Sequence, residues 1–133
     1  MERDIAVTCF YFDYVARKEQ SPINMLGSLL RQLINRFERI PDLIVREFRN
    51  QKKLIGGRGP NISAILNMFR VVTTTMRTFI CVDALDECAP ENRVVILDSL
   101  GQVLRGSSNT RIFINVIYGH AALRRDVAHH GNH

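Results

Sequence analysis

Three carboxylates follow an apolar run in the middle of the chain. Residues 79–82 are strand-like, and Asp83, Asp86 and Glu87 come directly after them. A carboxylate at the carboxyl end of a buried strand lies where α/β sheets bind ligands. Mg²⁺ favours oxygen ligands and is often shared between a carboxylate and substrate phosphates. The pattern therefore predicts a magnesium site at Asp83, with Asp86 and Glu87 one turn further on to orient water or support the metal.

The elements that must position these carboxylates alternate between strand and helix. Apolar, β-branched segments predict strands over residues 5–13, 78–83 and 111–116. Apolar residues at helical spacing fill the intervening segments. Strands that alternate with helices favour a parallel sheet, so we expect an α/β fold with about three parallel strands and helices on both faces.

Capping residues and prolines mark where the helices begin. The glycine-rich residues 56–60 break the chain between the second and third helices. Residues 119–129 are compatible with a last short helix. The expected helix starts are Ser21-Pro22, Pro41, Asn61 or Ser63, and Pro90-Glu91.

Helical spacing also predicts which side chains face the core. In the second helix these are Leu43, Ile44 and Phe48. In the fourth helix, the residues expected to face the core are Val94, Leu97, Leu100 and Leu104.

Length and composition are those of one globular domain. The chain has 133 residues, of which 46% are hydrophobic and 23% charged, a composition far from that of disordered chains. No apolar run is long enough to span a bilayer, and no signal peptide is recognisable, so we expect a cytoplasmic location. Three cysteines fit no metal-ligand spacing, and we expect Cys9 and Cys81, which lie in apolar runs, to be buried.

The net charge of +5 is concentrated in one part of the chain. Between Tyr14 and Pro60 there are ten basic residues and four acidic ones. A basic helical surface can bind nucleic acid. However, no aromatic residues interleave with the basic ones for base stacking, which favours an ordinary solvated helix surface.

Several segments in order resemble one family. Residues 79–88 read Phe-Ile-Cys-Val-Asp-Ala-Leu-Asp-Glu-Cys, which is similar to the Walker B block of NACHT-type signal-transduction ATPases of the STAND class. The likeness is in particular to the fungal vegetative-incompatibility set and to the nephrocystin N-terminal region. Residues 10–13, 20–22, 29–33 and 109–114 resemble the neighbouring blocks of that family, so the likeness spans residues 5–114 and leaves a divergent tail at 115–133.

The resemblance implies a P-loop nucleotidase fold and an ATP-binding signalling switch. It implies that Asp83 holds the magnesium ion at the ATP phosphates, and that Asp86 and Glu87 polarise the attacking water or support the metal. Phosphoryl transfer needs charge neutralisation and an oriented nucleophile more than covalent help. The alternative role for Asp86 and Glu87 is a favourable position near the amino end of the following helix.

The other half of such a site is missing from these residues. A P-loop needs Gly-x-x-x-x-Gly-Lys-Ser/Thr, whose amides and lysine hold the phosphates, and no Gly-Lys pair occurs in the chain. In the family this loop precedes the strand at residues 5–13, so we expect it upstream of Met1. The family's arginine turn after the third strand is also absent, because residues 115–120 read Asn-Val-Ile-Tyr-Gly-His.

Three functions follow from these observations. The first is a fragment of a NACHT-type switch that supplies the magnesium and water-positioning carboxylates but does not hydrolyse ATP alone. The second is a non-enzymatic module that pairs with other NACHT chains or with itself through an exposed sheet edge. The third, which the composition disfavours, is a basic nucleic-acid-binding domain. The histidines at 129, 130 and 133 are better explained as a frayed terminus than as a metal site.

Overall fold

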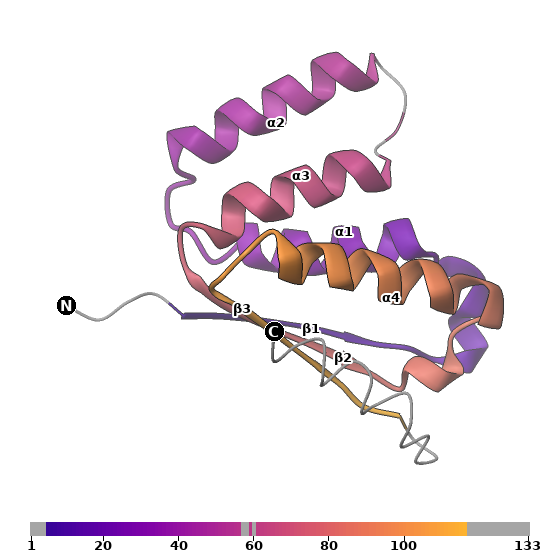
Figure 1. Ribbon diagram of the computed structural model, residues 1–133. Coiled ribbons are helices and arrows are strands. Elements are labelled where there is room, and N and C mark those ends of the chain that lie inside the picture. Colours follow the sequence, from indigo (N-terminus) through magenta and orange to yellow (C-terminus); the bar gives the residue numbers. More distant parts are fainter. Residues whose placement is uncertain (1–4, 57–58, 60, 117–133) are drawn as a thin grey trace.

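Three strands form one parallel sheet with the strand order β1-β2-β3. The structure is a computed structural model that describes residues 5–56, 59 and 61–116 (Figure 1). β1 (Ile5–Tyr11) pairs with β2 (Arg77–Asp83), and β2 pairs with β3 (Thr110–Ile114). The predicted α/β class with three parallel strands is confirmed, and the strand that carries Asp83 lies in the centre of the sheet.

Four α-helices and two short 3-10 helices connect the strands. The 3-10 helix η1 (Tyr14–Glu19) follows β1, and η2 (Leu85–Glu87) follows β2. The α-helices between β1 and β2 are α1 (Pro22–Ile34), α2 (Asp42–Ile55) and α3 (Ile62–Thr73), and α4 (Pro90–Arg105) joins β2 to β3.

The predicted helix starts are confirmed, and those of α1 and α3 have side-chain capping bonds. The Ser21 hydroxyl accepts the backbone N–H of Asn24 at 3.1 Å, and Pro22 is the first residue of α1. The Asn61 side chain accepts the N–H of Ala64 at 2.8 Å at the start of α3. Each bond satisfies one of the N–H groups that the first turn of a helix leaves without an intrahelical partner.

All the described α-helices lie on one face of the sheet. α1 and α4 pack on β1 and β3, α3 packs over both, and α2 packs on α3 as the outermost layer (Figure 1). The strand order explains this, because right-handed crossovers that step in one direction leave every helix on the same side. Among the described residues, the second face therefore lacks the helix cover that the continuous apolar strands led us to expect.

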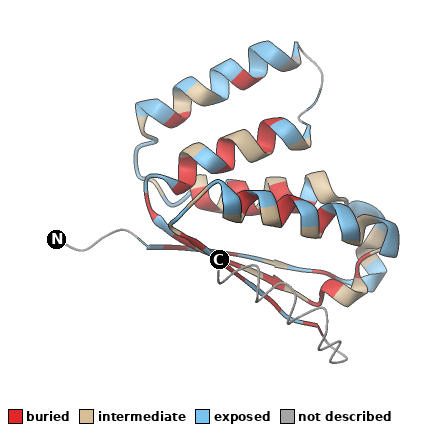
Figure 2. Ribbon diagram, viewed as in Figure 1, coloured by how far each residue is buried: buried red, intermediate tan, exposed pale blue. Residues whose placement is uncertain are grey.

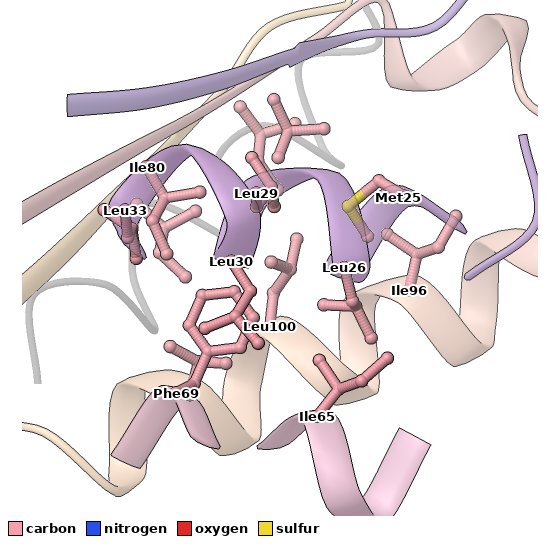
Figure 3. Close-up of a cluster of buried hydrophobic side chains, with 14 of the residues drawn as sticks. Met25, Leu26, Leu29, Leu30, Leu33, Ile65, Phe69, Ile80, Ile96 and Leu100 are labelled. Carbon is pink, nitrogen blue, oxygen red and sulfur yellow. The ribbon is translucent and has the colours of Figure 1, made fainter. Parts of the chain in front are cut away.

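The core lies between the sheet, α1, α3 and α4. Figure 3 shows Leu26 and Leu30 of α1 near Ile65 and Phe69 of α3, with Leu100 of α4 beside them. Figure 2 shows that α2 is mostly exposed, which agrees with its place in the outermost layer.

Two of the predicted helix faces were partly wrong. In α2 only Ile44 of the three predicted residues is buried, while Leu43 and Phe48 are about half exposed, because this outermost helix packs mainly on α3. In α4 the predicted Leu100 is buried, and the predicted Leu97 and Leu104 are partly buried and pack against the core. Of the four predicted residues, Val94 was placed wrongly, because it is 74% exposed. The buried residues that the prediction missed are Ile96, Ser99 and Val103.

The uncovered face of the sheet is largely apolar. Strand side chains alternate between faces, and the exposed set includes Val7 at 52% and Phe113 at 55% exposure. The rings of Phe79 and Phe113 stack on this face with their centroids 6.4 Å apart. We call this surface the open face; its members on the strands are Ile5, Val7, Cys9, Tyr11, Arg77, Phe79, Cys81, Asp83, Arg111 and Phe113.

Some predictions fall outside the described residues. The short helix at 119–129 and the histidines at 129, 130 and 133 lie there. Within residues 5–56, 59 and 61–116, no helix has the length and apolar character needed to cross a membrane.

Candidate functional site

Asp83 is the last residue of the central strand. Its backbone carbonyl accepts the N–H of Phe12 at 3.0 Å, which continues the β1–β2 ladder past Tyr11. Its side chain lies on the open face and is half-buried. No side chain of the described residues hydrogen-bonds the Asp83 carboxylate. Asp83 therefore lies at the carboxyl edge of a parallel sheet, as predicted.

A strained turn follows the strand. Ala84 is buried and has φ 58° and ψ 41°, in the left-handed region that residues other than glycine rarely adopt. A non-glycine residue there costs about 1–3 kcal/mol and persists only where the surroundings hold it. The turn ends β2 abruptly and leads into η2, so that Asp86 and Glu87 lie just beyond the same edge of the sheet as Asp83.

The Glu87 side chain is engaged with the segment after β1. Its Oε1 accepts the backbone N–H of Tyr14 at 3.0 Å, and its backbone carbonyl accepts Nε of Arg17 at 3.3 Å. Asp13 accepts the next N–H of the same segment, that of Val15, at 3.0 Å. Together the two carboxylates cap the start of η1 and tie it to the turn after the central strand.

Arg93 of α4 holds the other side of the turn. Its Nη2 donates to the backbone carbonyls of Asp86 at 3.2 Å and Cys88 at 3.1 Å, while its Nε is buried without a hydrogen-bond partner. Two arginine side chains, Arg17 and Arg93, thus bind three successive carbonyls. The turn that carries the predicted carboxylates is therefore braced from both neighbouring segments.

Asn115 is a neighbour that the motif-based prediction missed. Its N–H donates to the Val82 carbonyl at 3.0 Å, and its carbonyl accepts the N–H of Leu85 at 3.2 Å. These bonds place Asn115 beside Asp83 at the end of β3, where it is exposed. The signal was present in the sequence, because Asn115 is the first polar residue after an apolar strand. An amide side chain there can coordinate a hard cation or donate to a phosphate.

The described residues hold at most part of a metal site. No three His, Cys, Asp or Glu side chains among them come close enough to share an ion. Mg²⁺ bound at phosphates commonly uses one or two carboxylates together with water and the phosphates themselves. A single strand-end carboxylate with an amide beside it fits that role, and the structure assembles no all-protein cage of described residues around it.

Two thiols near the turn differ from an ordinary cysteine. Burial raises the pKa of Cys81, and the neighbouring Cys9 thiol and the Asp83 carboxylate raise it further. Burial also raises the pKa of Cys88, although Arg93 and Arg17 oppose the shift. The expected burial of Cys9 was wrong, because the open face leaves it exposed. The fully buried cysteine is Cys88, which follows Glu87.

Comparison with known proteins gives a family. The family model described as "Nephrocystin 3, N-terminal" matches residues 1–116, which include all three strands and the whole of the strand-end site. A search of curated proteins and a search of solved structures each find no match. Because the matched residues make up most of the chain, the chain belongs to the nephrocystin 3 N-terminal family.

Proposed function

We propose that this chain is the magnesium-binding half of a NACHT-type ATP-binding signalling switch. The observation that carries the proposal is the position of Asp83, a half-buried carboxylate at the end of the central parallel strand with Asn115 beside it. Membership of the nephrocystin 3 N-terminal family supports the ancestry. The three thiols are free, which suits the reducing cytoplasm where we place the switch.

Each residue of the strand-end site has a distinct role in this proposal. Asp83 supplies a carboxylate oxygen to Mg²⁺, and the ion, when bound, neutralises charge on the ATP phosphates. Asn115 presents its amide to the same edge. One carboxylate oxygen of Glu87 already accepts the N–H of Tyr14. In this proposal Glu87 therefore orders the turn, and its other oxygen can accept a hydrogen bond from water. Asp86 lies in the same braced turn.

The described residues supply no phosphate-binding loop for this site. No Gly-Lys pair occurs in the sequence, and glycine-rich phosphate loops depend on backbone amides and a lysine. The proposal therefore assigns phosphate binding to groups outside these 133 residues. It follows that this chain alone should bind Mg-ATP no more tightly than about millimolar, because without a phosphate loop few contacts remain to offset the costs of binding.

Paramagnetic Mn²⁺ provides a direct test of Asp83. We expect it to broaden backbone amide signals at the ends of β2 and β3 first, and we expect Asp83→Asn to remove that effect. Asp98→Asn is the matched control, because Asp98 is an exposed carboxylate on α4 that accepts Gln102 at 2.9 Å, away from the strand ends. Broadening that centres elsewhere or survives Asp83→Asn would refute the assignment. Micromolar binding of Mg-ATP to the unmodified chain would refute the half-site.

The two edges of the sheet favour self-association as a second function. The outer edge of β1 is closed by side chains: Gln32 bonds the N–H and carbonyl of Cys9 at 2.9 and 2.8 Å, and Arg36 donates to the Ile5 carbonyl at 2.6 Å. Among the described residues no such bonds protect the outer edge of β3. Unprotected edges pair with other strands, so we propose that a second copy of the chain adds there.

A matched pair of variants tests which edge is used. Phe113→Lys places a charge on β3 and Val7→Lys places one at a similarly exposed position on β1. Light scattering over a concentration series is expected to show weaker self-association for Phe113→Lys only. An equal effect of both variants would assign the contact to the open face as a whole, and a wild-type chain that stays monomeric would end this proposal.

A further inference from the structure

Cys9 and Cys81 face each other across the sheet. They are direct partners in the parallel register of β1 and β2, and strand alternation places both on the open face. Neighbouring strands lie about 4.7–4.9 Å apart, within the Cα separation of about 4.4–6.8 Å that a disulfide spans. The two side chains leave the sheet in the same direction, so no change of register is needed to join them.

The backbone around the pair is held firmly on the β1 side. Gln32 of α1 binds both backbone groups of Cys9 with its amide, in bonds of 2.9 and 2.8 Å. On the other side, Cys81 lies in the central strand, which is hydrogen-bonded to both neighbours. The thiols are therefore presented at a fixed spacing on a sheet that does not have to unfold for them to meet.

The two thiols differ in access. Cys9 lies on an edge strand and is exposed, whereas Cys81 is only partly exposed. Oxidation of a thiol depends on its exposure, so an oxidant meets Cys9 first and Cys81 is placed as the resolving thiol.

We propose that Cys9 and Cys81 form a reversible oxidation site that closes to a cross-strand disulfide under peroxide. The Cys9 sulfur attacks one oxygen of hydrogen peroxide, the O–O bond breaks, and a sulfenic acid and one water result. The Cys81 sulfur then attacks the Cys9 sulfur, the S–O bond breaks, and the hydroxide leaves with the Cys81 proton as a second water. The two thiols lose two electrons in total, and peroxide is reduced to two waters.

Such a bond would be easily reduced. Disulfide Cβ atoms lie about 3.8 Å apart, so strands at ordinary spacing must close by roughly 1 Å. Strained and exposed disulfides have more oxidising potentials and act as labile bonds. A disulfide between Cys9 and Cys81 also fixes β1 against β2 close to Tyr11 and Asp83, which are register partners two residues further along the strands. The site does not depend on nucleotide binding.

The third cysteine serves as an internal control. Cys88 is fully buried, follows η2, and has a raised pKa. It lies outside the strands, so it has no in-register partner. A native oxidation that is set by cross-strand geometry therefore leaves Cys88 as the remaining thiol.

The test treats the reduced full chain with equimolar hydrogen peroxide under native conditions. The protein is kept dilute enough to prevent contacts between chains. After alkylation in denaturant, we expect free thiols to fall from three to one. The intact mass should fall by two hydrogen atoms, and peptide mapping should link Cys9 to Cys81. Dithiothreitol should restore all three thiols. The unmodified chain carries this readout, so the result does not depend on any variant folding.

Two variants sharpen the interpretation. Cys81→Ser should stop the reaction at a Cys9 sulfenic acid, which dimedone traps with a gain of mass, while Cys88→Ser should leave disulfide formation unchanged. The proposal is overturned if the native chain gains oxygen atoms without a linked peptide, if the link involves Cys88, or if only disulfides between chains form.

Discussion

Removing the Glu87 side chain tests whether this carboxylate has a structural role. In Glu87→Ala the N–H of Tyr14 loses its acceptor at 3.0 Å, and the first turn of η1 keeps only the Asp13 cap. Losing a capping acceptor costs about 0.5–2 kcal/mol. Tyr14 is exposed and Glu87 is half-buried, so water replaces part of the bond. We therefore expect a loss of about 1 kcal/mol in the free energy of unfolding.

Urea denaturation followed by circular dichroism measures this loss. For a domain of this size about 1 kcal/mol corresponds to a fall in Tm of roughly 3–5 °C. Glu87→Gln keeps an acceptor of the same shape. It should lose only about half as much stability as Glu87→Ala, since hydrogen bonds to charged groups are roughly twice as strong as those to neutral ones. Glu38→Ala is the control, an exposed carboxylate between α1 and α2, with an expected change within about 0.5 kcal/mol.

The outcome bears directly on the site. If Glu87→Ala costs no more than Glu38→Ala, the hydrogen bond to Tyr14 carries no stability, and the assignment of Glu87 to ordering the turn is wrong. If the cost is as expected, a loss of metal or nucleotide response in Glu87→Ala reflects a displaced turn as much as missing chemistry. Glu87→Gln then becomes the informative variant, because it removes the charge and keeps an acceptor for Tyr14.

Two further predictions concern α4 and the buried thiol. Ile96→Asp should lower the free energy of unfolding by about 3–5 kcal/mol, because it buries a charge at a fully enclosed position. Val94→Asp changes an exposed residue two positions away, so urea denaturation should show a change within about 0.5 kcal/mol. Equal losses in the two variants would contradict the orientation of α4. Because the pKa of Cys88 is raised in the folded chain, the unfolded thiol ionises first as the pH rises past 9.0. The free energy of unfolding should therefore fall with rising pH, and fall less steeply in Cys88→Ala, as measured by urea denaturation between about pH 8 and pH 10. Identical slopes in the two proteins would show that Cys88 does not cause the fall.

Local signals in the sequence located the elements well. Ser21 and Asn61 cap helices with bonds inside one turn, so the information that places them lies within three residues. The face of α4 was harder, because apolar residues occupy more than one stripe. Both Val94 and Ile96 fit helical spacing, and only the neighbouring α3 and β3 decide which of them is buried. The position of a helix relative to its neighbours is not encoded in its own periodicity.

The one-sided cover of the sheet also depends on long-range order. An apolar strand such as β1 predicts burial on both faces, and the alternation of exposed and buried residues along it shows burial on one. The difference arises from the strand order β1-β2-β3, which local patterns in the sequence do not reveal. Reversing the direction of a single crossover would have put α4 on the other face. The exposure of Cys9 has the same cause, and so has the position of the proposed oxidation site at Cys9 and Cys81.

The roles of the three carboxylates separate only in three dimensions. Their sequence spacing made Asp83, Asp86 and Glu87 look like one cluster, and the partner of Glu87 is an N–H 73 residues away in sequence. Because that bond occupies one oxygen of Glu87, its freedom to bind an ion or a water is reduced. Asp83 ends the central strand, and no described side chain hydrogen-bonds its carboxylate. Of these two acids Asp83 is thus the better placed for a cation, and substitution of Asp83 should affect metal binding more than it affects stability.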